Sequence, residues 1–284
     1  MAEYKITNHI MHKDGVAVAQ VPSTNHSGTM TPLYIVCHDT ASPLSARGDI
    51  DWLAGRGGNR GSSAHFVVAR DGTITQLVPC NVIAWHAGKS KWNGRSNCNS
   101  FTIGIEIDNP GSMSFVNKTT MRGWFGTVSG QEDDFERRAT PQHGDHWWMH
   151  YTPEQIETVT GMCMAMVEAY KCKEIITHWL ISPGRKVDTN PLFPLEGLRA
   201  RVFGTPDQPP PSPTPPPPEA FVPDATILVE GTNLRREPKM GENVIGPLPL
   251  NLRVDVQSKN GEWYFIRTPA NARGYVYQDL IKLD

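Results

Sequence analysis

The first 200 residues contain several apolar runs of strand length, separated by polar or glycine-rich segments. The run LYIVCH, residues 33–38, is continuously apolar, which is typical of a central strand buried on both faces. In FTIGIEI, residues 101–107, every second residue is a large apolar one, so one face of a strand is predicted to be apolar. The segment AHFVVARDGTITQLV, residues 64–78, predicts two strands joined by a turn at Asp71-Gly72.

Helical patterns occur in two places. The segment TPEQ, residues 152–155, places Thr at the N-cap, Pro at the first helical position and Gln at the third. The predicted helix ends near Lys171, and its apolar residues recur at helical spacing: Ile156, Val159, Cys163, Met166, Val167 and Tyr170. A shorter helix is predicted around residues 44–54, with Ile50 and Leu53 facing inward.

The short run EIITH predicts one more strand, which ends at His178. The segment 109–151 is polar and contains glycine, and we predict no regular elements for it. Strands that alternate with helices indicate an α/β domain, with a mixed central sheet flanked by helices.

A proline-rich segment divides the chain. In TPDQPPPSPTPPPPE, residues 205–219, proline fixes φ and removes backbone donors, so we expect a semi-rigid spacer. We therefore predict a first domain over 1–204, a linker over 205–223 and a second domain over 224–284. Four short apolar runs in the last segment predict an all-β unit: ATILVE, LRVDVQS, EWYFIRT and GYVYQDLIKL. Asn260-Gly261 is the expected hairpin turn between the middle pair.

Charge and composition exclude several classes of partner. The net charge is −2, with 27 basic and 29 acidic residues, so the chain has no strong field for nucleic acid or an anionic membrane. No apolar stretch is long enough to cross a bilayer, and the N-terminus lacks the pattern of a signal peptide, so we expect synthesis in the cytoplasm. Five scattered cysteines without a CxxC pair indicate a reducing compartment rather than a disulfide framework.

Several chemically capable side chains lie at the predicted strand ends. His38 and His178 end two strands, Glu106 lies near the end of a third, and the loop after His178 carries Lys186 and Asp188. Two imidazoles and a carboxylate are a sufficient set for a catalytic zinc that keeps one position for water. Each residue alone also fits an ordinary role, as a hydrogen-bonded histidine, an exposed strand carboxylate or a solvated loop residue.

Five motifs occur together in one order: YIVCHDTAS, SAHFVVARDGTITQLV, AWHAG, IGIEIDNPG and THWLISPGRKVDTNP. In this set the chain, over residues 30–204, resembles zinc-dependent N-acetylmuramoyl-L-alanine amidases, a family that includes peptidoglycan-recognition proteins and phage amidases. The resemblance implies one Zn²⁺, with His38, His178 and Asp188 as ligands. It also implies that Glu106 is the general base and that Lys186 stabilises negative charge.

The resemblance further implies hydrolysis of the amide between N-acetylmuramic acid and L-alanine in peptidoglycan. Some family members have a catalytic tyrosine just before the histidine that corresponds to His65. Here that position is Ala64, so Glu106 is left to carry the proton transfers.

Three further residues are predicted to contact substrate: Trp85 and His86 of AWHAG, and Asn99. For Trp85 and His86, a packed tryptophan and a structural histidine are equally compatible with the sequence. His143, His146 and His150 lie near two tryptophans in the 109–151 segment, and we interpret them as part of a loop flanking the groove rather than as a second metal cluster.

The tail resembles a bacterial SH3-like barrel in the segments TNLRREP, GEWYFIR and GYVYQDLI. Basic and acidic residues balance in the tail, so we expect binding to the cell wall to depend on its aromatic residues rather than on charge. The same aromatic residues could equally fill a small core. Two functional hypotheses follow. The first is a peptidoglycan amidase that degrades the cell wall, as a phage or prophage endolysin does, with a bacterial remodelling enzyme and a cytosolic wall-recycling amidase as alternatives. The second is a non-catalytic peptidoglycan-binding protein. The presence of all five residues of the proposed active site favours the enzyme.

Overall fold

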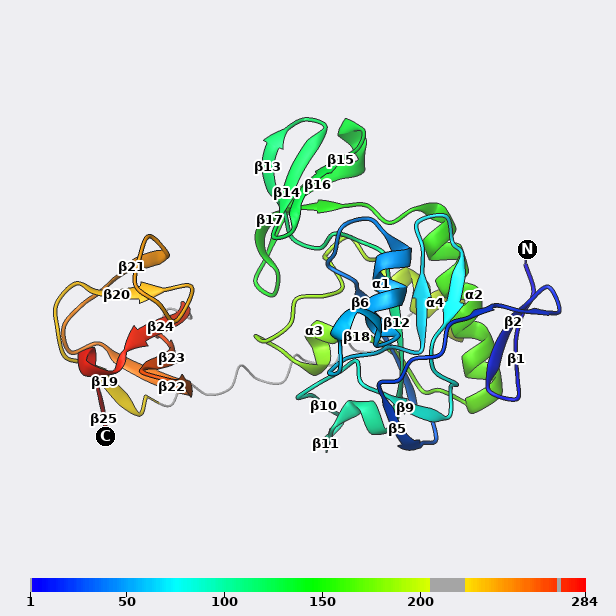
Figure 1. Cartoon of the computed structure of the whole chain (residues 1–284), viewed down its shortest axis with the longest axis horizontal. Helices are drawn as coiled ribbons and strands as arrows, with labels where there is room; N and C mark the ends of the chain where they lie inside the picture. The colour runs from blue at the N-terminus through cyan, green and yellow to red at the C-terminus, as the bar shows by residue number, and fades with distance from the viewer. Residues whose placement is uncertain (1, 205–222, 270–271) are drawn as a thin grey trace. The chain divides into compact units, whose positions relative to one another are not determined.

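A six-stranded mixed sheet lies at the centre of the first part of the chain (Figure 1). The strand order is β18-β6-β12-β7-β8-β4, in which β18, β6, β12 and β7 are mutually parallel and β8 runs antiparallel to β7. The strand bounds are Ala19–Gln20 (β4), Tyr34–Asp39 (β6), Phe66–Val68 (β7), Ile74–Gln76 (β8), Thr102–Ile107 (β12) and Ile175–Thr177 (β18). The mixed sheet confirms the fold class predicted from the apolar runs, and Gly72 in the β7–β8 turn has φ +78°.

The computed structural model describes residues 2–204, 223–269 and 272–284. The chain divides into two compact units, Met1–Pro213 and Thr214–Asp284. The division between the units falls within the predicted linker, 205–223. Of that linker, residues 205–222 lie outside the described residues. Among the described residues, no helix is both long and apolar enough to cross a membrane.

One face of the sheet is covered by the helix α2 (Pro153–Tyr170) and the shorter α4 (Leu195–Phe203). Thr152 and Gln155 form the predicted capping box, and Lys171 ends α2 in a left-handed conformation. Apolar residues of α2 pack against the sheet in the main core, including Val159, Met162, Cys163 and Met166. Cys37 and the other four cysteines are all buried and free.

The opposite face carries smaller elements. The helices α1 (Ala46–Leu53) and α3 (His178–Ile181) lie here, with the 3-10 turns η1 (Arg56–Gly58) and η2 (Cys98–Ser100). Leu53 of α1 is buried and Ile50 packs beside it, as predicted. Because His38 and Val36 lie two residues apart on β6, they share this face, and Val36 packs against α3.

Short strands extend the first unit at its edges. β1 (Tyr4–Thr7), β2 (Ile10–Lys13) and β3 (Val16–Ala17) form a small sheet against α2. Here the Tyr4 ring lies over Gly161, where an added Cβ would come within 2.3 Å of the ring. Two further antiparallel pairs are β5 (His26–Thr29) with β9 (Val82–Ala84), and β10 (Lys91–Trp92) with β11 (Arg95–Ser96).

The 109–151 segment, for which the sequence predicts no regular elements, is rich in β-structure and extends away from the central sheet as a lobe (Figure 1). It has a three-stranded sheet and a hairpin, whose bounds are Ser114–Asn117 (β13), Thr120–Gly123 (β14), Gly126–Ser129 (β15), Phe135–Thr140 (β16) and Gly144–Met149 (β17), with the 3-10 turn η3 (Glu132–Asp134). A small core holds it together, built from Met113, Met121, Val128, Phe135 and Met149. The strands are short and mostly exposed, so their apolar period is weak in the sequence.

In the second unit, the regular elements of residues 223–269 and 272–284 are β-strands and one 3-10 turn. Its strands are Ala225–Ile227 (β19), Thr232–Arg235 (β20), Val244–Leu248 (β21), Arg253–Asn260 (β22), Trp263–Arg267 (β23), Arg273–Tyr277 (β24) and Ile281–Leu283 (β25), with η4 at Gln278–Leu280. They form one sheet in the order β21-β20-β24-β23-β22-β19-β25. β22 and β23 make the predicted hairpin, with Gly261 at φ +59°. Of the aromatic residues predicted to bind the wall, Trp263 is buried, whereas Tyr264, Tyr275 and Tyr277 are half-buried.

Candidate metal centre

Three of the predicted site residues converge on one point at the edge of the sheet. The Nδ1 atoms of His38 and His178 lie 2.9 Å apart, and the Oδ2 atom of Asp188 lies 3.1 Å and 2.9 Å from them. Both histidines are almost fully buried. Among the described residues, these three are the group of His, Cys, Asp and Glu side chains placed to share a metal ion.

The fold brings the three residues together from distant parts of the sequence. β6 and β18 are parallel neighbours, so the residues at their carboxyl ends, His38 and His178, lie side by side. The loop after α3 returns to the same edge, where the backbone N–H of Trp179 donates a 2.8 Å hydrogen bond to the carbonyl of Asp188.

Asp39 supports the loop that carries Asp188. Its carboxylate accepts a 2.8 Å hydrogen bond from the backbone N–H of Asn190 and a 2.5 Å bond from the hydroxyl of Tyr151. Neither Asp39 nor Tyr151 was singled out from the sequence. For Asp39 the available signal was an acidic residue at the end of a buried strand.

The donor set fits a divalent cation. The Nε2 atom of His178 lies 3.1 Å from the carbonyl of Ala87, which can only accept, and 3.3 Å from Nη2 of Arg185. Because Nη2 of Arg185 has shorter hydrogen bonds to the carbonyls of Ala87 and Lys89, the proton of the His178 imidazole is placed on Nε2, and Nδ1 keeps its lone pair. Two imidazole nitrogens and a carboxylate oxygen that meet at one point are a donor set that a divalent cation would hold together. Ligand atoms of tetrahedral zinc lie about 3.3 Å apart, only a few tenths of an ångström more than here.

Burial keeps the imidazole of His38 neutral. Desolvation, with the adjacent His178, lowers the pKa of His38 to about 4. At neutral pH the imidazole is therefore uncharged, which is the form that binds a metal.

Glu106 lies beside the cluster. β12 pairs with β6 so that Glu106 is opposite His38 in the register of the sheet. Burial raises the pKa of Glu106 well above its usual value, and the carboxylates of Asp188 and Asp39 raise it further. A raised pKa makes a carboxylate a stronger base, which suits it to take a proton from a reacting molecule.

Two cations lie in the loop before Asp188. Lys186 is half-buried, and its charge lowers the pKa of both His38 and Glu106, which places its ammonium near the cluster. Arg185, which the sequence analysis did not single out, donates from Nη2 to the carbonyls of Ala87 and Lys89 at 2.8 and 2.9 Å. It therefore ties this loop to the segment that follows β9.

The three residues predicted to contact substrate have internal partners. The Asn99 side-chain oxygen accepts hydrogen bonds from the backbone N–H groups of His86 and Ala87, at 3.0 and 2.7 Å. His86 is buried behind His38, where it faces the interior rather than a groove. Trp85 is half-buried, and its indole N–H donates to the Ser27 hydroxyl at 3.3 Å. Binding of substrate by these residues stays a prediction, but His86 and Asn99 already have structural roles.

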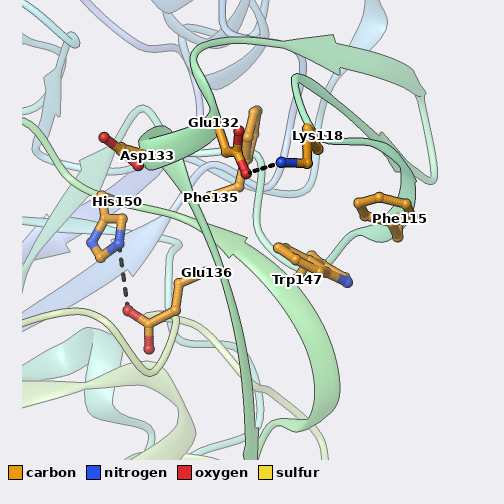
Figure 2. A pocket seen from close by; sticks show the side chains of 8 residues that line it. All are labelled: Phe115, Lys118, Glu132, Asp133, Phe135, Glu136, Trp147 and His150. Carbon is orange, nitrogen blue, oxygen red and sulfur yellow. Dashed lines mark ion pairs between the residues drawn. The ribbon is translucent and has the colours of Figure 1, made fainter.

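The histidines of the 109–151 segment form no metal group among the described residues. His143 instead lies 3.0 Å from the carbonyl of Thr189, next to Asp188, and so braces the same loop. A separate pocket of about 370 Å³ lies in this lobe, and none of the predicted site residues lines it. Figure 2 shows its ion pairs, Lys118 with Glu132 and His150 with Glu136.

Comparison with known proteins gives several relatives. The chain is 29% identical over 142 residues to 1,6-anhydro-N-acetylmuramyl-L-alanine amidase AmpD of Escherichia coli K12, which covers 49% of this chain and 58% of that protein. It is 47% identical over 140 residues to AmpD of Haemophilus influenzae, covering 49% and 58%. It is 31% identical over 133 residues to N-acetylmuramoyl-L-alanine amidase AmiD of Escherichia coli K12, covering 46% and 38%. In each case the match spans less than two-thirds of the relative.

A solved structure of AmiD from E. coli, in complex with anhydro-N-acetylmuramic acid-L-Ala-D-gamma-Glu-L-Lys, aligns with a TM-score of 0.45 at 21% identity, covering 70% of this chain and 65% of that one. The family model described as N-acetylmuramoyl-L-alanine amidase matches residues 28–191. This match spans more than half of the chain and contains all eight predicted site residues. The chain therefore belongs to the N-acetylmuramoyl-L-alanine amidase family.

Proposed function

We propose that the first unit is a zinc-dependent amidase that hydrolyses the amide bond between N-acetylmuramic acid and L-alanine in peptidoglycan or in fragments of it. The observation that carries the proposal is the convergence of His38, His178 and Asp188 beside Glu106, in a chain of this family. The curated relatives AmpD and AmiD, which are named as amidases of muramyl-L-alanine bonds, support the choice of bond.

His38, His178 and Asp188 would hold the zinc ion. When bound there, zinc supplies polarisation of the scissile carbonyl and lowers the pKa of a water molecule toward about 7. Three protein ligands leave room for water or substrate, as catalytic zinc sites require.

The protein's own residues would manage the protons and the charge. Glu106 would take the proton of the attacking water and pass it to the nitrogen of the leaving L-alanine, so one carboxylate serves first as base and then as acid. Lys186 would stabilise the negative charge that develops on the carbonyl oxygen as the water adds. The chain has alanine at residue 64, so no tyrosine hydroxyl shares the proton transfers at that position.

The direct test is digestion of purified sacculi, with the new chain ends identified by mass spectrometry. We expect free L-alanine amino termini and glycan strands that carry unsubstituted lactyl groups. Chelator treatment should abolish both products, and the addition of zinc should restore them. New reducing sugar ends or cleavage within the peptide stem would contradict the proposed bond.

The second hypothesis, a binding protein without catalysis, requires a defect in the site. The structure brings the three candidate ligands together and places Glu106 next to His38, so the residues favour catalysis. Binding of peptidoglycan fragments without any turnover in the zinc-loaded protein would favour this alternative.

Two observations favour substrates of different size. The name of the relative AmpD specifies a 1,6-anhydro-N-acetylmuramyl group, which favours a small soluble fragment such as a recycling enzyme would hydrolyse. The second unit, which we propose to be an SH3-like wall-binding domain, suits an extended polymer better, as in an endolysin. Comparing turnover on soluble anhydromuropeptides with release from sacculi separates these roles.

A further inference from the structure

His86 lies directly behind the proposed zinc ligand His38. Its Nδ1 atom is 2.9 Å from Nε2 of His38, on the side of the ligand imidazole that faces away from Asp188. The two rings meet edge to face, with centroids 5.0 Å apart at an interplanar angle of 82°. Both side chains are buried, so each ring nitrogen must find its partner within the protein.

The partners of His86 determine where its proton lies. Its Nε2 atom is 3.3 Å from the carbonyl oxygen of Thr102 and 3.3 Å from the hydroxyl oxygen of the same residue. The carbonyl can only accept, and the hydroxyl already donates its proton to the carbonyl of Cys98 at 2.8 Å. Both neighbours are therefore acceptors, and His86 must carry its proton on Nε2.

The proton of His38 then follows. A neutral His86 with its proton on Nε2 offers only a lone pair at Nδ1, so the facing Nε2 of His38 must donate. With its proton on Nε2, His38 keeps the lone pair on Nδ1, the atom that meets His178 and Asp188. If His38 lacked a proton on Nε2, its lone pair would face the lone pair on Nδ1 of His86. If His86 instead carried its proton on Nδ1, the lone pair on its Nε2 would face the carbonyl oxygen of Thr102.

We propose that His86 is a positioning residue for the zinc site, which holds His38 in the tautomer and the orientation that present Nδ1 to the metal. The inference deepens the proposed function and rests on the same site. Histidine ligands of metals commonly donate their second ring N–H to a fixed acceptor, and here a second imidazole serves as that acceptor.

The surroundings of His86 hold its ring in place. The Asn99 side chain fixes the backbone N–H groups of His86 and Ala87. On β12, an added Cβ at Gly104 would come within 2.5 Å of the imidazole of His86, so the ring can pack against the strand only because this residue is glycine. This contact explains why glycine, and no residue with a Cβ, stands at residue 104 on the face of β12 that carries Thr102 and Glu106.

Two variants separate the hydrogen bond from the packing. His86→Phe keeps a ring of similar size but removes the acceptor, whereas His86→Asn places an amide oxygen near the position of Nδ1. His65→Phe is the matched control. His65 is equally buried and packs against His86, but its hydrogen bonds go to the N–H of Gly104 and the carbonyl of Val82.

The first measurement is a long-range ¹⁵N–¹H NMR correlation of the imidazoles in the metal-free wild-type chain. We expect His38 to be protonated on Nε2. The second is the zinc dissociation constant, measured by competition with a chromophoric chelator. His86→Phe should weaken zinc binding by roughly 10–100-fold, His86→Asn should recover most of the loss, and His65→Phe should bind zinc as the wild type does.

Wild-type protein with His38 protonated on Nδ1 would overturn the inference without any variant, as would a folded His86→Phe chain with unchanged zinc affinity. Both readouts are independent of turnover. A correct tautomer in a chain that cleaves no muramyl-L-alanine bond would therefore contradict the proposed function and leave this inference standing.

Discussion

Replacement of Glu106 by glutamine separates proton transfer from metal binding. Glutamine has the same shape as glutamate and cannot accept a proton at neutral pH. Glu106 is not one of the three proposed ligands, so zinc binding and the fold should be retained. Loss of a general base costs roughly 10²–10⁴-fold in kcat, which corresponds to about 3–5 kcal/mol of transition-state stabilisation.

The structure adds a second, independent consequence of the same change. Burial raises the pKa of Glu106 in the folded chain, so the folded state holds this proton at pH values where the unfolded state has lost it. In the metal-free protein, Glu106 therefore lowers stability as pH rises above about 4.3, the usual glutamate value, by up to about 1.4 kcal/mol per pH unit until its folded pKa is reached. Metal-free Glu106→Gln should be more stable than the wild type at pH 7, and the difference should vanish near pH 4.

Two assays test both consequences. Turnover of a soluble muropeptide, normalised to zinc content, gives the catalytic effect, and denaturant unfolding of the metal-free chains between pH 4 and 8 gives the stability difference. Wild-type turnover in the zinc-loaded variant would refute the role of Glu106. A stability difference independent of pH would refute its placement in a desolvated, negatively charged site.

Further changes test the other parts of the site and the second unit. His178→Ala and Asp188→Ala should each lower zinc content and abolish hydrolysis, because only three protein ligands hold the ion; activity in either variant without bound zinc would contradict this. Lys186→Ala should keep zinc and reduce kcat by about 10²-fold, or about 3 kcal/mol, and an unchanged kcat would remove Lys186 from the mechanism. A chain that ends at Gly204 should match the full chain on soluble muropeptides but act more weakly on sacculi, since a tethered second site raises the local concentration; equal activity on sacculi would exclude targeting by the second unit.

The periodicity of apolar residues was enough to predict the strands that carry His38 and Glu106. The strand ends at His38 and Glu106 were found because β6 is buried over its full length and β12 at every residue except Glu106, so both strands show clear apolar patterns. The capping box of α2 was found because Thr152 and Gln155 act through local hydrogen bonds, which depend on neighbouring residues alone.

The lobe of residues 109–151 could not be predicted in the same way. Its strands are four to six residues long, and most of their side chains are exposed, so few positions carry the apolar signal. Its contact with the site depends on single hydrogen bonds, such as that between His143 and the carbonyl of Thr189, which have no local pattern in the sequence.

The sequence also left open whether the side chain of His86 points toward a substrate or into the protein. For His86 the sequence was equally compatible with substrate contact and with a structural role. The ring lies against His38, where the absence of a Cβ at Gly104 of β12 leaves space for it. Residue type indicated chemistry near the site, while tertiary packing decided whether the residue meets a substrate or another side chain.

In the proposed mechanism, one zinc ion held by His38, His178 and Asp188 enables the chain to hydrolyse a muramyl-L-alanine amide. Titration of zinc into the metal-free protein, with amide hydrolysis followed at each step, tests it most directly. We expect no activity without metal and a linear rise to a sharp break at one zinc per chain, with no rise in His178→Ala. Full activity in the metal-free protein, or an equal rise in His178→Ala, would contradict it.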